Sequence, residues 1–412
     1  MPDVSPEATA IWMYEPADHY RTPPEPSSEK VRSGFLKLMD KLRRRKTAEE
    51  SFVSVKNLRH VPDKILSRAA PIPDWEDSVA ALSKNLESWS GLLSQQPDIR
   101  VFLSPPFSGI TRSLTLWANR THCRIMSPPS LDQILSSEAL DWGNHDDRKD
   151  SIFVIAGLER FFIRHYNGLD LIRHIMRRLS STPCRCLISC DSWAWAYFIH
   201  ALDIQRMMPP PVTLSAFDRD RLRKWFQELS VRGDIKQPAF RQADDGCYVI
   251  QHPENVQASE TADLHPTEKE LSDFLYHLAA CSRGNPGTAW HIWRHSLRCE
   301  PDEAFKDSND IDMGKETIWV KPWKQLALTT LPEDLTKEEL LLLHSLLLHG
   351  GVSLPVLEKI VPMPCHCLEQ SLFRMASLGL TEVSNQTWRV TPLSYPAVRR
   401  YVENEGYLVD AF

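Results

Sequence analysis

Residues 101–118 read Val-Phe-Leu-Ser-Pro-Pro-Phe-Ser-Gly-Ile-Thr-Arg-Ser-Leu-Thr-Leu-Trp-Ala, and they are the most informative segment about the fold. Its apolar start predicts a buried strand, and the small and Pro-rich residues that follow predict a turn. The apolar spacing from Thr111 onward predicts a helix. A strand, a turn and a helix in immediate succession are typical of α/β proteins.

The same stretch follows the frame of a phosphate-binding loop, G-x-x-x-x-G-K-[ST], between a strand and a helix. Gly109 and Thr111 keep the second Gly and the Ser/Thr of that frame, whereas Ser104 replaces the first Gly and Ile110 replaces the Lys. In such loops the Lys reaches the β- and γ-phosphates. The stretch therefore predicts the fold of a phosphate-binding loop and argues against the reaction that such a loop usually supports.

The pattern around this loop alternates between strands and helices, which predicts a doubly wound parallel sheet. A helix with an apolar period near 3.6 precedes it at 74–94. We expect strands at 100–103, 123–126, 151–156 and 184–190, and helices at 111–119, from 130 onward and at 169–179.

The second half of the chain predicts further elements. We expect a helix at 217–229, a β pair near 240 and 249, helices over 267–298 with a break at 284–287, and a strand at 317–320. The last 80 residues predict three helices and then two short strands, which is the order of a winged helix. The helices are expected at 337–348, 353–361 and 365–378, and the strands at 380–383 and 387–390.

These parts suggest four segments. They are a flexible N-terminal arm with a basic amphipathic helix (1–70), a P-loop NTPase-like domain whose parallel sheet lies between helices (71–265), a helical lid with a linker (266–330) and a winged-helix domain (331–412).

The order of these parts resembles the AAA+/STAND branch of the P-loop ATPases, over roughly residues 72–405. The resemblance is carried by four places, which look like the Walker A loop, the Walker B strand, the sensor-1 strand and the G-x-P element of the lid. They are 104–111, 153–159, 184–191 and 284–286.

The resemblance implies a fold whose catalytic groups are missing. Ile110 stands at the Walker A Lys, and Ala156 stands at the Walker B Asp that holds Mg²⁺ in family members. Glu159 stands at the position of the acid that activates water in family members; a surface acid beside Arg160 is the alternative. The resemblance therefore implies a degenerate pseudo-ATPase that acts as a scaffold or regulatory subunit, with a slow ATPase using Thr111 and Glu159 as an alternative.

No firmly bound cofactor is expected, but weak binding of ATP or ADP without firmly held Mg²⁺ stays open. The backbone amides of Ser108, Gly109 and Thr111 open a helix, where anions bind without any Lys. The resemblance also places Pro286 at the adenine. Against binding, Pro105 and Pro106 remove two N–H donors from the loop.

A protein partner or a homo-oligomer is the expected interaction. Trp193 and Trp195 cannot share one helix face, so we expect one of them to be exposed as a partner site; a core plug is the alternative. A basic helix at 31–50 ends in Arg-Arg-Arg-Lys at 43–46. It is either a solvated helix end or an arm that docks on a partner, a membrane surface or nucleic acid.

DNA binding through the winged helix is the other alternative. The third helix of that domain carries Glu369, Gln370 and Arg374, which is little positive charge for a duplex. Lys359, Arg389, Arg399 and Arg400 add to the basic residues of this domain. We expect the winged helix to pack on the nucleotide domain instead.

Composition sets the remaining expectations. The formal net charge of −6 gives no overall attraction to nucleic acid. No signal peptide and no apolar run long enough for a bilayer are recognised, and nine scattered cysteines suggest reduced thiols in the cytoplasm. Cys184 and Cys186 alternate on a strand and are expected to share one core face, so no metal site is predicted.

Overall fold

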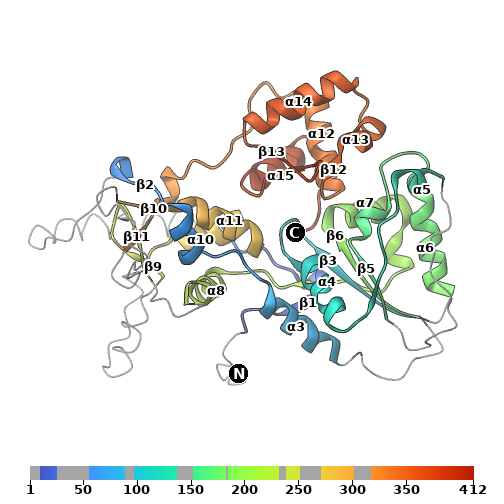
Figure 1. Cartoon of the computed structure of the whole chain (residues 1–412), viewed down its shortest axis with the longest axis horizontal. Helices are drawn as coiled ribbons and strands as arrows, with labels where there is room; N and C mark the ends of the chain where they lie inside the picture. Colours follow the sequence, from blue (N-terminus) through green and yellow to red (C-terminus); the bar gives the residue numbers. More distant parts are fainter. Residues whose placement is uncertain are drawn as a thin grey trace, which may run out of the picture. The chain divides into compact units, whose positions relative to one another are not determined.

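The computed structural model describes residues 10–25, 55–87, 89, 97–136, 152–181, 184–231, 238–250, 271–300 and 317–412 (Figure 1). They divide into two compact units. Unit 1 takes its residues from 1–21, 75–215 and 328–412, and unit 2 from 22–74 and 216–327. Each unit is described by itself below.

The centre of unit 1 is a six-stranded sheet in the order β1-β7-β3-β6-β5-β4. All neighbouring strands in it are parallel except β1, which pairs antiparallel with β7. The strands are β1 (Tyr14–Pro16), β3 (Asp98–Ser104), β4 (Arg124–Ile125), β5 (Ile152–Ala156), β6 (Arg185–Asp191) and β7 (Val212–Leu214).

Helices cover both faces of this sheet (Figure 1). They are α3 (Glu76–Glu87), α4 (Ile110–Arg120), α5 (Leu131–Ser136), α6 (Asp170–Ser181) and α7 (Ser192–Leu202). Val101 and Leu103 point into the core that α6 and α7 share. Phe102, between them in sequence, is 0% exposed but lies outside that core, because successive side chains of a strand alternate between faces.

The strand order places a crossover point beside the predicted loop. β6 lies between β3 and β5, with Ser104 opposite Asp191 and Ala156 opposite Ser189. The chain runs from β3 to β4 across the sheet, whereas β6 is followed by β7 on the other side of β3. In open parallel sheets, ligands bind at the carboxyl ends of the strands at such a point.

The C-terminal domain (residues 328–412) belongs to the same unit. It contains α12 (Lys337–Leu348), β12 (Val352–Ser353), α13 (Leu354–Ile360), α14 (Cys365–Ser377), β13 (Thr381–Ser384), β14 (Thr387–Val390) and α15 (Tyr395–Asn404). The strands form an antiparallel sheet in the order β12-β14-β13. Thr336 and Glu339 cap α12 reciprocally, and Gly379 ends α14 with a φ of +71°.

Unit 2 contains β2 (Arg59–His60), α2 (Asp63–Ala69), α8 (Arg219–Val231), β8 (Ala239–Gln242), β9 (Tyr248–Ile250), α10 (Phe274–Cys281), α11 (Pro286–Ser296), β10 (Leu297–Cys299) and β11 (Thr317–Val320). Its five strands form one sheet in the order β2-β10-β11-β8-β9. Aromatic side chains fill its core: Trp293 stacks on Phe226 at 5.1 Å and touches Phe240 and Phe274.

Most of the expected elements are confirmed. The strands at 100–103, 123–126, 151–156, 184–190 and 317–320, and the helices around 111–119, 169–179, 217–229, 337–348 and 365–378, all correspond to observed elements. The sequence did not predict α2, α15 or the strands β1, β2, β7, β10 and β12. Most of these are strands of two or three residues, too short to show a period. The expected helix at 31–50 lies outside the described residues.

Candidate functional site at the carboxyl edge of the sheet

The loop after β3 closes on itself. The amide of Ser108 donates to the carbonyl of Pro105 at 3.0 Å, and the hydroxyls of Ser104 and Ser108 lie 3.2 Å apart. Ser108 is 2% exposed. One of the amides expected to meet an anion is therefore already used by the turn.

Two aromatic contacts flank this loop. Gly109 has a φ of +81°, and the ring of Trp75 lies so close that a Cβ on Gly109 would sit 2.5 Å from it. On the other part of the loop, Phe107 contacts the ring of Tyr395 from α15 edge to face, with centroids 5.8 Å apart. The C-terminal domain thus packs directly on the loop.

Ile110 and Ala156, the residues compared above with the Walker A Lys and the Walker B Asp, are both apolar. Ile110 is also buried. Its side chain is 0% exposed, so this position of α4 faces packed protein. Ala156 ends β5 and carries no ligand group. Thr111 is half-buried in the first turn of α4.

Glu159 follows β5 in a short 3-10 helix (Leu158–Phe161). One of its carboxylate oxygens accepts a hydrogen bond of 2.8 Å from the backbone amide of Asp191, at the end of β6. Burial raises the pKa of Glu159, and the Asp191 amide opposes that shift. This acid joins the ends of two strands, which is a structural use of the group that matched the water-activating position.

Asp191 starts α7. Its carboxylate caps the helix by accepting from the amide of Trp193 at 2.8 Å. Burial raises the pKa of Asp191 well above its ordinary value, and the negative charge of Glu159 adds to the shift. Two acids with raised pKa values therefore lie side by side at the switch point, in a site with little water.

The C-terminal domain covers these acids. A Cβ on Gly350 would lie 3.7 Å from Cγ of Glu159 and 4.0 Å from a carboxylate oxygen of Asp191. The indole N–H of Trp193 donates to the hydroxyl of Tyr395 at 3.2 Å. α12 also packs against α7.

The last residues of the chain complete the contact. The hydroxyl of Ser192 donates to the carboxylate of Asp410 at 2.5 Å, and Asp410 pairs with Arg399 of α15 at 3.2 Å. The side chains of this pair are 0% and 4% exposed. Phe412 meets the ring of Tyr20 at 4.8 Å.

Two buried histidines lie in the same interface. His349 accepts from the amide of Arg164 at 3.4 Å, and His344 lies 3.0 Å from the carbonyl of Leu408. Burial, with the Arg164 guanidinium as a further cause, lowers the pKa of His349 to about 3 and that of His344 to about 4. Both rings are therefore neutral near pH 7.

These residues do not fit a magnesium nucleotide. The turn amide of Ser108, the Glu159 carboxylate and the Asp191 carboxylate are each bonded within the chain. Ile110 and Ala156 supply no cation and no metal ligand. Among the described residues, no group of three or more His, Cys, Asp or Glu side chains is arranged to hold a metal ion.

Only some of the predicted site residues belong to the same unit. Ser108, Gly109, Thr111 and Glu159 lie together at the carboxyl edge of the unit 1 sheet. Pro286 begins α11 in unit 2, with Asn285 as its cap, so its contact with an adenine stays a prediction.

The prediction that Trp193 or Trp195 is exposed is wrong. Both belong to α7 and are only 1% and 4% exposed. α7 is enclosed by the sheet and by the C-terminal domain, so opposite faces of the helix are both buried. Both tryptophan side chains are therefore packed against other residues of the same chain.

Three of the five basic residues considered for DNA form ion pairs inside the C-terminal domain. Arg374 pairs with Glu339 and with Asp334, Arg389 pairs with Glu382, and Arg399 is buried against Asp410. Sequence reasoning had no signal for Asp410 or Tyr395, because their partners lie about 200 residues away in the chain.

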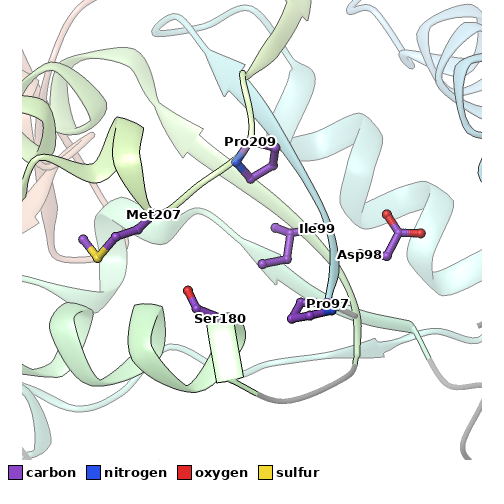
Figure 2. Close-up of a pocket in the computed structure, with 6 residues that line it drawn as sticks. All are labelled: Pro97, Asp98, Ile99, Ser180, Met207 and Pro209. Atoms are coloured by element: carbon purple, nitrogen blue, oxygen red, sulfur yellow. The ribbon is translucent and has the colours of Figure 1, made fainter. Parts of the chain in front are cut away.

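A hollow of about 640 Å³ lies elsewhere on unit 1, at the amino end of β3 (Figure 2). It is lined by Pro97, Asp98, Ile99, Ser180, Met207 and Pro209. A second hollow of about 370 Å³ adjoins it through Met207 and carries Arg173, Arg177 and His200. Neither of these two hollows involves the loop or the acids described above.

Unit 1 is thus an α/β unit with a mostly parallel sheet among helices. Comparison with solved structures finds distant similarity to several proteins. Cdc6p from Pyrobaculum aerophilum matches with a TM-score of 0.31 and 14% identity over 84% of this chain and 99% of that one. The Orc2 protein of Aeropyrum pernix, solved as ADPNP–ADP complexes, matches with a TM-score of 0.31 and 14% identity over 95% of this chain and 97% of that one. A single-residue variant of RuvB from Thermotoga maritima matches with a TM-score of 0.28 and 12% identity over 85% of this chain and 96% of that one.

No protein-family model matches the sequence, and no curated protein matches it significantly. Within the described residues, no helix combines the length and the apolar character that crossing a bilayer requires.

Proposed function

We propose that this chain is a non-hydrolysing relative of the AAA+/STAND ATPases that works as a scaffold or regulatory subunit through protein contacts. The observation that carries the proposal is the closed carboxyl edge. The loop bonds to its own backbone, Glu159 accepts from the Asp191 amide, and Asp191 caps α7. Gly350 and Tyr395 of the C-terminal domain pack on this edge.

The physical reason is that hydrolysis needs groups that are free to meet phosphate and Mg²⁺. Metal and Lys neutralise the charge that develops on the transferred phosphoryl group. Here the corresponding positions are apolar, and the remaining acid has a raised pKa and a backbone partner. The C-terminal domain fills the carboxyl edge of the sheet, where a nucleotide would have to enter and leave. This arrangement favours a protein of fixed shape over one that goes through a catalytic cycle.

The ion pairs argue against the DNA alternative. A protein binds duplex by replacing counterions with its own cations. Arg374, Arg389 and Arg399 are paired with carboxylates, so each would have to give up a partner first.

The test is calorimetric titration of the full chain with ATP and with ADP, each with and without Mg²⁺, combined with radiolabelled ATP turnover. We expect no saturable heat below millimolar nucleotide and the same background turnover for the wild type and Glu159→Gln. The Gln variant is the matched control because its amide oxygen still accepts from the Asp191 amide. Micromolar affinity, or turnover that Glu159→Gln abolishes, contradicts the proposal.

A further inference from the structure

The outward face of α14 carries an aromatic side chain at its centre. Phe373 is 64% exposed and meets Trp388 of β14 edge to face at 5.6 Å. Val383, 52% exposed, is the register partner of Trp388 on β13, so the two share one face of the hairpin. We call Phe373, Trp388 and Val383 the α14–wing patch. Phe373 and Val383 are its exposed members, whereas Trp388, which contacts Phe373 and pairs with Val383, is only 7% exposed. Exposed apolar side chains that lie together mark interaction sites.

The charges around this patch are mainly acidic. Glu369 is exposed one turn before Phe373, and Glu358 accepts a hydrogen bond from Cys365 at the start of α14. The single positive charge of Arg374 is smaller than the combined negative charge of its two carboxylate partners, Glu339 and Asp334. Lys359 offsets one negative charge, and the Arg389–Glu382 pair is neutral, so the surroundings of α14 remain net negative.

An apolar centre with an acidic border fits a basic amphipathic segment. The sequence of this chain contains one in residues 31–46. Its apolar residues are Phe35, Leu36, Leu38, Met39 and Leu42, and they are followed directly by Arg43, Arg44, Arg45 and Lys46. Amphipathic helices bind grooves and patches through apolar anchors, while charged neighbours set orientation and partner choice.

We propose that the α14–wing patch binds residues 31–46 of a second copy of this chain. The inference deepens the proposed scaffold function and rests on it, since it names the surface and the chemistry of one protein contact. Duplex DNA is the disfavoured occupant, because the phosphates would face Glu358 and Glu369.

The first measurement is sedimentation velocity of the full chain at about 50 mM salt. We expect self-association that Phe373→Ser weakens about 30-fold, the effect of removing one aromatic anchor of roughly 2 kcal/mol. Tyr166→Ser is the matched control, since Tyr166 is an 83% exposed aromatic residue that is not a member of the patch. Equal thermal midpoints for the two variants exclude unfolding as the cause.

The second measurement identifies the occupant. A fluorescein-labelled peptide of residues 31–48 is titrated into full chain in which Arg43, Arg44, Arg45 and Lys46 are each replaced by Glu, so that its own segment does not compete. We expect saturable anisotropy that Phe373→Ser removes and that added salt weakens. Introducing Glu369→Lys into the Glu-substituted chain is expected to restore self-association in part, because the charges are then exchanged.

Three results overturn the inference: a monomeric wild type at about 50 µM, peptide binding that Phe373→Ser leaves unchanged, or duplex DNA binding that Phe373→Ser removes. Nucleotide binding in the calorimetric test contradicts the proposed function but leaves these measurements unaffected. Failure of the inference and failure of the proposed function are therefore separable.

Discussion

Removal of the Asp410 carboxylate is predicted to loosen the closed edge of the sheet. In Asp410→Ala, Arg399, which is 4% exposed in the unsubstituted chain, loses a carboxylate partner at 3.2 Å. The Ser192 hydroxyl loses its acceptor in the same step. Breaking a buried ion pair on one side costs about 3–5 kcal/mol because an uncompensated charge remains.

The contacts that remain around Arg399 place the expected loss of unfolding free energy in the lower part of this range of about 3–5 kcal/mol. Arg399 keeps Glu403 at 3.0 Å and the main-chain carbonyl of residue 410 at 2.8 Å, which still compensate part of its charge. The orphaned Ser192 hydroxyl adds about 1 kcal/mol. We therefore expect the free energy of unfolding of unit 1 to fall by about 3–4 kcal/mol.

The assay is urea unfolding followed by tryptophan fluorescence, because Trp193 donates to Tyr395 in the same interface. Asp334→Ala is the control, since Asp334 is also an arginine partner but is 78% exposed, and exposed pairs contribute little. A second variant, Asp410→Ala with Arg399→Met, is expected to recover part of the loss because the buried cation is gone. If Asp410→Ala unfolds at the same urea concentration as Asp334→Ala, the reasoning about the buried pair is refuted.

Two further predictions concern the loop and the buried histidines. Gly109→Ala is expected to destabilise by about 1–3 kcal/mol, since its φ of +81° is strained for Ala and the Cβ would overlap the Trp75 ring. Gly246→Ala, with a φ of +67° and open space around it, is the control and should lose only about 1 kcal/mol in thermal unfolding. For His349, the folded-state pKa of about 3 lies below the usual value of 6.5, so the unfolded chain binds more protons between those pH values. The contribution of His349 to stability is therefore complete above pH 6.5 and declines as the pH falls toward 3. His349→Gln, whose amide oxygen still accepts from the Arg164 amide, should flatten this part of the stability–pH curve; an unchanged slope between about pH 4 and 6.5 would show that the ring does not stay neutral in the folded chain.

The local elements near the site could be predicted from neighbouring residues. The apolar run before Ser104, the positive-φ requirement met by Gly109 and the helical period after it depend on neighbouring residues, so strand, turn and helix were predictable. The same holds for α12, whose bounds were predicted as observed, with Thr336 and Glu339 as a local cap. The replacement of Lys and Asp by Ile110 and Ala156 was also visible in the sequence alone.

The contacts that these elements make could not be predicted, because they depend on how distant parts of the chain pack together. Glu159 looked like a free acid, but it bonds to the Asp191 amide, because β5 and β6 end side by side. Trp193 and Trp195 looked too far apart on a helix for both to be buried, yet the C-terminal domain covers the face that the sheet leaves open. Contacts such as Ser192 with Asp410 join positions 218 residues apart. No local pattern encodes such a pair, because it forms only when two complete elements pack together.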